Sequence, residues 1–442
     1  MRKTIRKVLS LLLASAVTLS MAACGSTGGD TATTTTAKDT DTTTTAGGTT
    51  AEGETTTGNT DGAAFESKIG VILVHDENTG YDFAHIEGIK KAAAAVGISE
   101  DNIIFKYNIS EDETCYDTAT DLVEQGCTYI FSDSYGHQSY MKQAAEENPT
   151  VVFTSMTGDM AAASGLKNYK NAFNHTYQSR YVSGVVAGMK LAELVAADKV
   201  PAGSIDSDGN IKIGYVGAYP YAEVVSGYTA FYLGVKSVVK NVAMSVTYTN
   251  SWYDPTSEAE AANSLISSGC IILSQHADST GAPAAVQAAF EAGTTAYCVG
   301  YNIDMLTVAP DAALTSAQND WSVFYTYAFT QILAGKELAT DWAEGYNSGA
   351  VHISALGKSC AEGTADKVAE VEGKLKDGSL QVFDTANFTV GGKAVTSYLA
   401  IDKDGDFKGD EGEAIEGGIF YESKLRSAPY FGLRIDGITE LN

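Results

Sequence analysis

Residues 171–191 read NAFNHTYQSRYVSGVVAGMKL, and this stretch decides how the rest of the chain is organised. After a short extended start it continues as a predicted helix whose only charged side chains are those of Arg180 and Lys190. A helix that is apolar nearly all round is buried against other elements. Glycine inside a helix costs about 0.5–1 kcal/mol relative to alanine, so Gly184 and Gly188 indicate a face that a neighbouring backbone approaches closely. We predict that the chain here leaves one α/β lobe and enters another.

Strands alternate with helices on both sides of this stretch. The run KIGVILV (Lys68–Val74) is almost continuously apolar, as expected for a strand buried in a parallel sheet. The run IKIGYVG (Ile211–Gly217) restarts the same pattern in the second half of the chain. Strand–helix units at this spacing are typical of βαβ architecture. The sequence therefore predicts an α/β protein with two lobes, each built on a doubly wound parallel sheet.

Charge and cysteine content exclude several classes of function. The chain has 442 residues and a formal net charge of −26, and lysine and arginine form no cluster after residue 7. Nucleic-acid binding requires cationic contacts to phosphates, so we expect none. The six cysteines show no CxxC or Cys/His metal spacing, so we predict no metal site and no obligatory disulfide.

The N-terminus has the features of an export signal. Positive charges at residues 2–7 precede a short apolar core, Val8–Met21, which is too short to span a bilayer stably. The following Met21-Ala22-Ala23-Cys24 resembles the lipobox of bacterial lipoproteins. That resemblance implies that residues 1–23 are removed and that Cys24 carries a lipid anchor; the alternative is plain secretion after Ala23. Residues 24–66 are rich in threonine and poor in apolar side chains, which predicts a disordered tether.

An acidic stretch near the C-terminus imitates a calcium loop. Asp402, Asp404 and Asp406 alternate with other residues, and Glu413 stands twelve positions from the start. Phe407 occupies the position where such a loop requires glycine, and no flanking helices are predicted. We interpret the stretch as an acidic turn and leave calcium binding open.

Aromatic and acidic side chains follow strand after strand. In parallel sheets, ligands bind at the carboxyl ends of the strands. Aromatic faces combined with carboxylates suit a flat ring that carries N–H or O–H donors, such as a purine with or without ribose. The alternative for each residue is ordinary packing inside a loop. The candidate ligand-binding residues are Asp76, Tyr81, His85, Tyr135, Tyr219, Trp252, Asp278, Asp304 and Trp321.

Several of these positions lie in motifs that resemble the basic membrane protein family, the lipid-anchored substrate-binding components of ABC transporters. The resemblance covers roughly residues 68–356. It implies a type I periplasmic-binding-protein fold, with two lobes joined by a three-strand hinge and the ligand in the cleft. Purine nucleobases and nucleosides are the leading ligands that it implies. The motifs are GYDFAHIEG (Gly80–Gly88), TYQSRYVSGVVAG (Thr176–Gly188), IGYVGAYPYAEVVSGYTAFYLGV (Ile213–Val235), NSWYDP (Asn250–Pro255) and QHADS (Gln275–Ser279).

The resemblance also implies roles for individual residues. Tyr81 and Tyr135 would line the cleft from the first lobe, at positions where the family often has Trp and Phe. Trp252, Asp278 and Asp304 would line it from the other lobe. Either aspartate could accept hydrogen bonds from the ligand or only cap a turn. Trp321 would cover the ring, and His85 would contact the base or play a structural part.

The expected domain boundaries follow from the same comparison of motifs. They are a signal peptide at 1–23, a tether at 24–66, lobe 1 at 67–173 and about 305–345, lobe 2 at 174–304 and about 346–400, and an acidic C-terminal hairpin and tail at 401–442.

Taken together, these features favour a passive receptor on the outer face of the cell membrane. It would be monomeric and without a cofactor, and it would close on its ligand and dock on an ABC transporter permease. Neither GxSxG nor HExxH occurs in the sequence, and we expect no enzymatic activity. The alternatives are a ligand-sensing surface receptor, an enzyme acting on nucleosides, or a sugar- or amino-acid-binding protein of the same fold.

Overall fold

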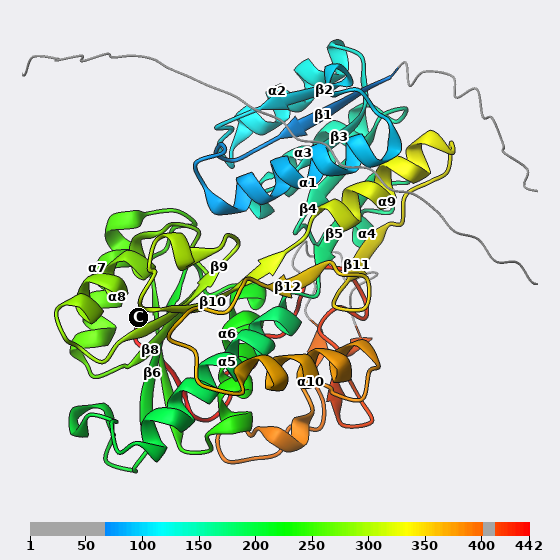
Figure 1. Cartoon of the computed structure of the whole chain (residues 1–442). Helices are drawn as coiled ribbons and strands as arrows, with labels where there is room; N and C mark the ends of the chain where they lie inside the picture. The colour runs from blue at the N-terminus through cyan, green and yellow to red at the C-terminus, as the bar shows by residue number, and fades with distance from the viewer. Residues whose placement is uncertain (1–66, 401–411) are drawn as a thin grey trace, which may run out of the picture. The chain divides into compact units, whose positions relative to one another are not determined.

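The computed structural model describes residues 67–400 and 412–442 (Figure 1). The predicted signal peptide, the lipid-bearing Cys24, the tether and the aspartates at 402, 404 and 406 lie outside the described residues. The chain divides into two units, Met1–Gly62 and Ala63–Asn442, and the fold reported below is that of the second unit. Within the described ranges, no helix combines the length and apolar character needed to cross a bilayer.

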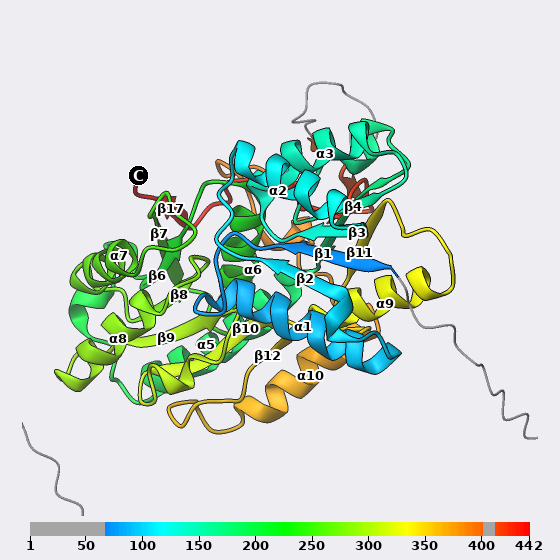
Figure 2. The same cartoon turned by 90° about the horizontal axis from the view of Figure 1, so that it is seen from above.

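The first sheet has six strands in the order β11-β5-β4-β3-β1-β2, and all its pairings are parallel. Its side chains alternate between two faces, so Ile69 and Val71 pack with α1 and α9 while Ile72 packs with α2 and α3. Figure 2 shows these helices as separate layers on either side of the sheet. We call this sheet and its helices lobe 1. Its elements are β1 (Lys68–Ile72), α1 (Gly80–Val96), β2 (Ile103–Lys106), α2 (Glu113–Glu124), β3 (Cys127–Ser132), α3 (Gln138–Glu147), β4 (Val152–Met156), α4 (Ala161–Ser164), β5 (Tyr169–Asn174), α9 (Ser322–Leu333) and β11 (Asp341–Glu344).

The second sheet has seven strands in the order β12-β10-β9-β8-β6-β7-β17. Its pairings are parallel except for that of β12, which runs antiparallel to β10. Helices α5 and α6 cover one face, and α7 and α8 cover the other. We call this sheet and its helices lobe 2. Its elements are α5 (Thr176–Ala196), β6 (Ile211–Gly217), α6 (Ala222–Val238), β7 (Val242–Tyr248), α7 (Pro255–Ser267), β8 (Ile272–Gln275), α8 (Gly281–Glu291), β9 (Tyr297–Tyr301), β10 (Ala313–Asn319), β12 (Val351–Ile353), α10 (Thr364–Lys376) and β17 (Ile438–Glu440).

Residues 176–191 of the apolar stretch belong to α5, which packs along α6. A Cβ atom added at Gly184 would overlap the carbonyl oxygen of Phe231 in α6, and one added at Gly234 would overlap the carbonyl oxygen of Tyr181. The two backbones therefore touch, which only glycine permits at these positions. At Gly188 an added Cβ would lie 2.9 Å from the Cβ of Val238. The predicted close approach at Gly184 and Gly188 is confirmed.

The chain crosses between the lobes three times, after β5, after β10 and between β11 and β12. The predicted fold, with two parallel-sheet lobes of the periplasmic-binding type, is confirmed. One boundary differs from the expectation, because β10 pairs with β9 and β12 in lobe 2. The return to lobe 1 therefore begins after Asn319 and not near residue 305.

The C-terminal segment also departs from the expected hairpin and tail. A short hairpin does form between β15 (Ile415–Glu416) and β16 (Ile419–Phe420). The chain then continues to β17, which pairs in parallel with β7 at the edge of the lobe 2 sheet. The last residues are thus part of lobe 2, because their backbone groups complete the hydrogen bonding of an edge strand.

Candidate ligand-binding site

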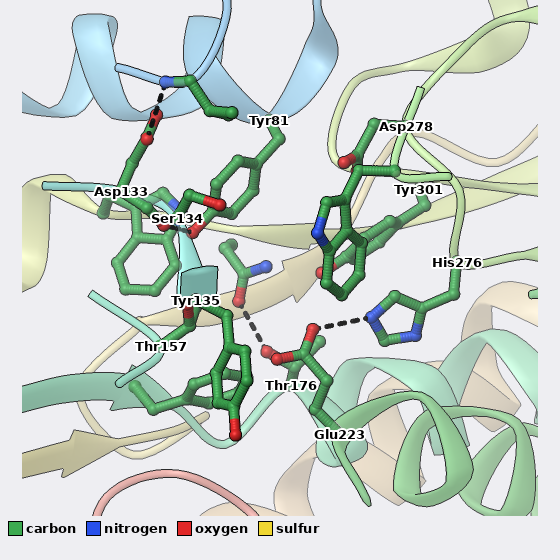
Figure 3. Close-up of a pocket in the computed structure, with 15 residues that line it drawn as sticks. Tyr81, Asp133, Ser134, Tyr135, Thr157, Thr176, Glu223, His276, Asp278 and Tyr301 are labelled. Atoms are coloured by element: carbon green, nitrogen blue, oxygen red, sulfur yellow. Dashed lines mark hydrogen bonds and ion pairs between the residues drawn. The ribbon is translucent and has the colours of Figure 1, made fainter. Parts of the chain in front are cut away.

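A cavity lies where the carboxyl ends of both sets of strands meet (Figure 3). It encloses about 490 Å³ of space free of atoms, its opening to solvent included. Parallel strands end at one edge of their sheet, so the residues that follow them converge on this space. Its lining residues are Val74, Tyr81, Asp133, Ser134, Tyr135, Thr157, Phe173, Thr176, Glu223, Trp252, His276, Asp278, Tyr301, Asn319 and Trp321.

An aromatic wall on the lobe 1 side is built from α1 and the start of α9. The Tyr81 ring lies edge-on to Trp321, with their centroids 6.5 Å apart. His85 stacks behind Trp321 at 4.3 Å, and its Nδ1 lies 2.9 Å from the Tyr325 hydroxyl. Burial lowers the pKa of His85 to about 3, so the ring is neutral. His85 therefore supports Trp321 from behind and does not line the cavity.

The indole nitrogen of Trp321 is a buried donor. Its Nε1 has no hydrogen-bond acceptor among the described residues, although Trp321 is only 2% exposed. A buried donor without an acceptor costs free energy that a ligand acceptor can recover.

Two buried aspartates face the cavity from opposite lobes. Asp133 follows β3, and its Oδ1 accepts the Val74 N–H at 3.0 Å. Asp278 follows β8, and its Oδ1 accepts a hydrogen bond from the Asn302 amide at 2.7 Å. Burial raises the pKa of both carboxyls, aided by the negative charge of Asp82 near Asp133 and of Glu258 near Asp278.

Glu223 is the third carboxyl in the cavity, and it is paired with a neutral histidine. The His276 Nε2 lies 3.2 Å from Glu223 Oε1, and its Nδ1 lies 3.5 Å from the Tyr215 hydroxyl. Burial lowers the pKa of His276, and the nearby Arg180 guanidinium lowers it further. These partners favour the tautomer with hydrogen on Nε2, which donates to Glu223.

Arg180, a charged residue near the start of the buried helix α5, supports the lobe 2 side from behind. Its guanidinium carbon lies 3.6 Å from the centroid of the Tyr301 ring, and its Nη1 donates to the Gln275 carbonyl. Arg180 is fully buried and is not part of the lining. Among the described residues that line the cavity, none is lysine or arginine.

Five of the nine candidate residues line the cavity. Tyr81, Tyr135 and Trp321 come from lobe 1, and Trp252 and Asp278 come from lobe 2.

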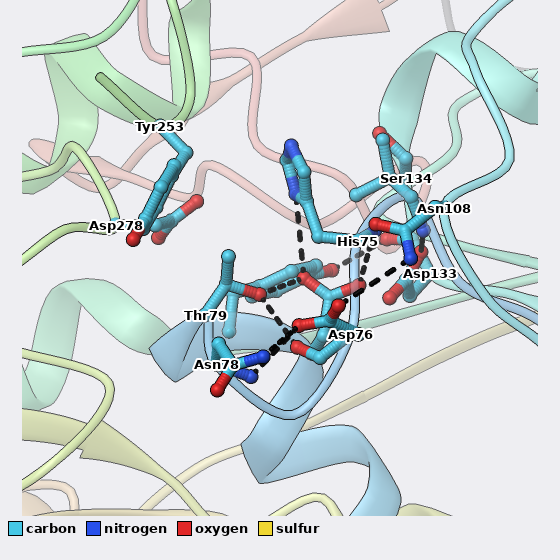
Figure 4. A network of polar contacts seen from close by, with 12 residues as sticks. His75, Asp76, Asn78, Thr79, Asn108, Asp133, Ser134, Tyr253 and Asp278 are labelled. Carbon is cyan, nitrogen blue, oxygen red and sulfur yellow. Dashed lines mark hydrogen bonds and ion pairs between the residues drawn. The ribbon is translucent and has the colours of Figure 1, made fainter. Parts of the chain in front are cut away.

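The other four lie outside the lining. His85 stands behind Trp321, as described above. Asp76 caps its own loop, since its Oδ1 accepts hydrogen bonds from Asn78 N at 3.0 Å and Asn78 Nδ2 at 2.8 Å (Figure 4). Tyr219 stacks on Tyr221 at 5.1 Å. Asp304 accepts a hydrogen bond from Leu306 N at 2.9 Å, which is the turn-capping alternative.

Ten lining residues were not among the candidates. Some of them could have been found by the strand-end rule, because Asp133, His276 and Tyr301 follow or end strands just as the candidates that line the cavity do. Others, such as Thr176 and Glu223, lie on helices, to which the strand-end rule does not apply. The ten are Val74, Asp133, Ser134, Thr157, Phe173, Thr176, Glu223, His276, Tyr301 and Asn319.

Ring contacts between the lobes flank the cavity on two sides. The His75 ring of lobe 1 lies 5.7 Å from the Tyr253 ring of lobe 2, and Figure 4 shows the two side chains facing each other. His75 is held by Asp82, whose Oδ1 accepts the His75 N–H at 2.7 Å. On another side, Tyr135 lies 5.5 Å from Tyr221. These contacts describe a closed arrangement of the lobes.

Two parallel-sheet lobes, three crossings and a cavity between the strand ends define the class of two-lobed solute-binding proteins. Residues 71–385 match the family model described as ABC transporter substrate-binding protein PnrA-like. The chain belongs to this family, as its motifs predicted. Its members are extracytoplasmic binding components that carry a solute to a transporter permease.

Two relatives of known description match most of the chain. A purine-binding protein of Brucella abortus is 29% identical over 317 residues, which are 72% of this chain and 83% of the relative. A protein of Haloferax volcanii is 30% identical over 365 residues, which are 82% of this chain and 80% of the relative. The latter is named as an ABC transporter glucose-binding protein, in a form that marks the name as provisional.

Solved structures show the same fold at lower identity. A solute-binding protein of an ABC transporter from Aeropyrum pernix superposes with a TM-score of 0.59 at 15% identity, covering 71% of this chain and 92% of its own. One from Conexibacter woesei gives a TM-score of 0.54 at 19% identity, covering 71% and 98%. At these identities the likeness concerns the fold alone.

Proposed function

We propose that this protein is a lipid-anchored receptor that captures a purine nucleobase or nucleoside between its lobes and delivers it to an ABC importer. The observation that carries the proposal is the composition of the cavity. It pairs the rings of Tyr81, Trp252 and Trp321 with the carboxyls of Asp133, Glu223 and Asp278.

This composition fits the chemistry of a purine. Aromatic faces stack on a flat heterocycle, and carboxyl oxygens accept hydrogen bonds from ring N–H, amino or ribose O–H groups. A site with three acidic groups, and with no lysine or arginine among the described residues of its lining, disfavours phosphates and carboxylates, which bind to cations. The likeness to the purine-binding protein of Brucella abortus supports the same ligand class.

Binding and closure are the whole of the proposed activity. The ligand touches both lobes only when they are shut, so it stabilises the closed form through its higher affinity for that form. We expect no chemical change in the ligand.

The direct test is isothermal titration calorimetry with adenine, adenosine, guanosine, inosine and glucose. We expect at least one purine to bind and to be recovered unchanged, and glucose to give no heat. Failure of every purine to bind would refute the proposal.

A sugar is the second candidate, because the Haloferax volcanii relative is named as a glucose-binding protein. Aromatic faces and carboxylates also suit a sugar, which stacks its C–H face and donates its hydroxyls. Binding of glucose without any purine in the same titrations would establish this alternative.

The membrane anchor is a separate part of the proposal. In the full-length chain expressed in a bacterial host, Cys24 should incorporate a labelled fatty acid and the protein should fractionate with membranes. Substitution Cys24→Ala should abolish both, and labelling that persists in this variant would contradict the assignment.

A further inference from the structure

The final segment of the chain, residues 419–442, lies beyond the family match and is anchored to lobe 2; we call it the C-terminal strap. Its strand β17 pairs with β7, and Asn442 Oδ1 accepts the Tyr248 N–H at 2.8 Å. Near its start, the buried Glu422 accepts a hydrogen bond from Ser226 of α6. Both ends of the strap are thus held by lobe 2.

Between these two anchors the strap reaches lobe 1 (red in Figure 1). Arg426 Nη2 lies 3.6 Å from Asp159 Oδ2, and the two side chains are only 2% and 3% exposed. Next to it, Ser427 donates two hydrogen bonds, from N and from Oγ, to Asp341 Oδ1, both at 2.9 Å. Asp159 follows β4 and Asp341 begins β11, so both acceptors belong to lobe 1. The strap therefore bridges the two lobes through buried polar contacts.

Asp159 connects the strap to the ligand cavity. The Tyr135 hydroxyl donates to Asp159 Oδ2 at 3.1 Å, which is the same oxygen that faces Arg426. Tyr135 lines the ligand cavity and also contacts Tyr221 of lobe 2. Ala428 and Pro429 of the strap share a second, smaller cavity with Tyr135, Thr157, Asp159, Tyr221, Ala222 and Glu223.

We propose that Arg426 is a positioning residue for ligand capture, which fixes Tyr135 at the cavity through Asp159 and ties lobe 1 to lobe 2. A buried carboxylate requires a partner, and Arg426 supplies its positive charge. With Asp159 held, the Tyr135 ring is preorganised, so the ligand need not order it on binding. The effect on ligand affinity rests on the proposed function, whereas the tie between the lobes does not.

The first test is a double-mutant cycle on the full chain, with adenine and adenosine as probes in calorimetry. Arg426→Met should weaken binding by at least tenfold, and Arg426→Lys should restore most of the loss. In a Tyr135→Phe background, Arg426→Met should add no more than a twofold change, because its route to the ligand is already cut. The control is Arg434→Met. Arg434 is an exposed arginine of the same strap whose ion-pair partner among the described residues is Glu440, so this variant should stay within twofold of wild type.

If Arg426→Met reduced ligand affinity equally in the wild-type and Tyr135→Phe backgrounds, or did not reduce it at all, the positioning role would be overturned. If Arg426→Met does not fold by circular dichroism, Asp159→Asn takes its place in the cycle and is judged by the same factors.

A second test needs no ligand. In the ligand-free Arg426→Met variant, amide hydrogen exchange should be faster than in wild type within residues 133–138 and 157–161. This increase in lobe 1 is expected in addition to any increase in the strap itself. If no purine binds the wild type, the proposed function fails and this measurement still decides the strap. Faster exchange confined to the strap would overturn the tie between the lobes.

Discussion

Trp321 is the residue that connects packing to the proposed ligand site. It immediately precedes α9, at the point where the chain returns to lobe 1, and His85 and Tyr81 contact its ring from two directions. Its indole N–H lacks an acceptor among the described residues. The ring is thus fixed before the ligand arrives, and its donor is free to bind.

We expect Trp321→Ala to weaken purine binding by about 1–3 kcal/mol, the range measured for stacking of a base on an aromatic side chain. Calorimetry gives the difference directly. Trp321→Phe, which keeps a stacking face but removes the indole donor, is the matched control and should lose less. An affinity for the alanine variant equal to that of wild type would remove Trp321 from the site.

Glu258 gives a prediction about pH. It is fully buried at the start of α7, and burial raises its pKa to about 7. A carboxyl whose pKa is higher in the folded state stabilises the fold below its unfolded pKa, and that contribution is lost as pH rises through the folded pKa. The pH window therefore runs from 4.5, the ordinary pKa of a glutamate side chain, to about 7.

As pH rises from 4.5 to 8, the free energy of unfolding of wild type should therefore fall relative to that of Glu258→Gln, by up to about 3 kcal/mol. Urea unfolding of both proteins at several pH values measures the difference. A constant difference across this range would mean that Glu258 does not titrate there.

Among the helices and strands, the close packing of α5 on α6 can be tested most directly by substitution. Gly184→Ala places a methyl group against the backbone of α6 and should destabilise the protein by about 1–3 kcal/mol or more through overpacking. Gly373→Ala is the matched control, because this glycine also lies inside a helix, α10, but an added Cβ there meets nothing within 4 Å. The control should stabilise the protein by about 0.5–1 kcal/mol. Equal effects of the two substitutions on urea unfolding would contradict the close approach.

The secondary-structure elements differ in how well the sequence predicts them. Apolar runs such as Lys68–Val74 and the glycines of α5 carry local signals, so the strands, helices and two-lobed fold could be predicted. The sequence could not predict that β10 belongs to lobe 2 or that β17 pairs with β7, because neither depends on the local pattern of apolar residues. Both are decided by which distant strand offers free backbone groups.

The residues of the candidate site could be predicted only in part, because the sequence does not show which way a side chain points. Asp278 and Asp304 each follow a strand and look alike in sequence, yet one faces the cavity and the other caps a turn. The direction of the side chain distinguishes them, and sequence does not contain it. Glu223 shows the converse, because it reaches the cavity from the first turn of helix α6 and does not follow a strand directly.

For the whole molecule, the proposed function makes ligand capture depend on the balance between open and closed lobes. Contacts that exist only when the lobes are shut stabilise the closed form and slow release of the ligand. The His75–Tyr253 contact at the cavity's edge is of this kind, since its rings belong to different lobes and neither lines the cavity.

We therefore expect Tyr253→Ala to speed ligand release without removing a ligand contact. An aromatic pair contributes about 0.5–1.5 kcal/mol beyond its buried area, which corresponds to a roughly 2- to 12-fold faster dissociation rate if the contact is lost on opening. Stopped-flow tryptophan fluorescence measures that rate, and the association rate should change much less. Tyr107→Ala is the control, because this exposed tyrosine stacks on Phe105 of its own lobe and should leave dissociation unchanged. If Tyr253→Ala slowed association and left dissociation at the wild-type rate, the contact would belong to the entry of the ligand and not to closure.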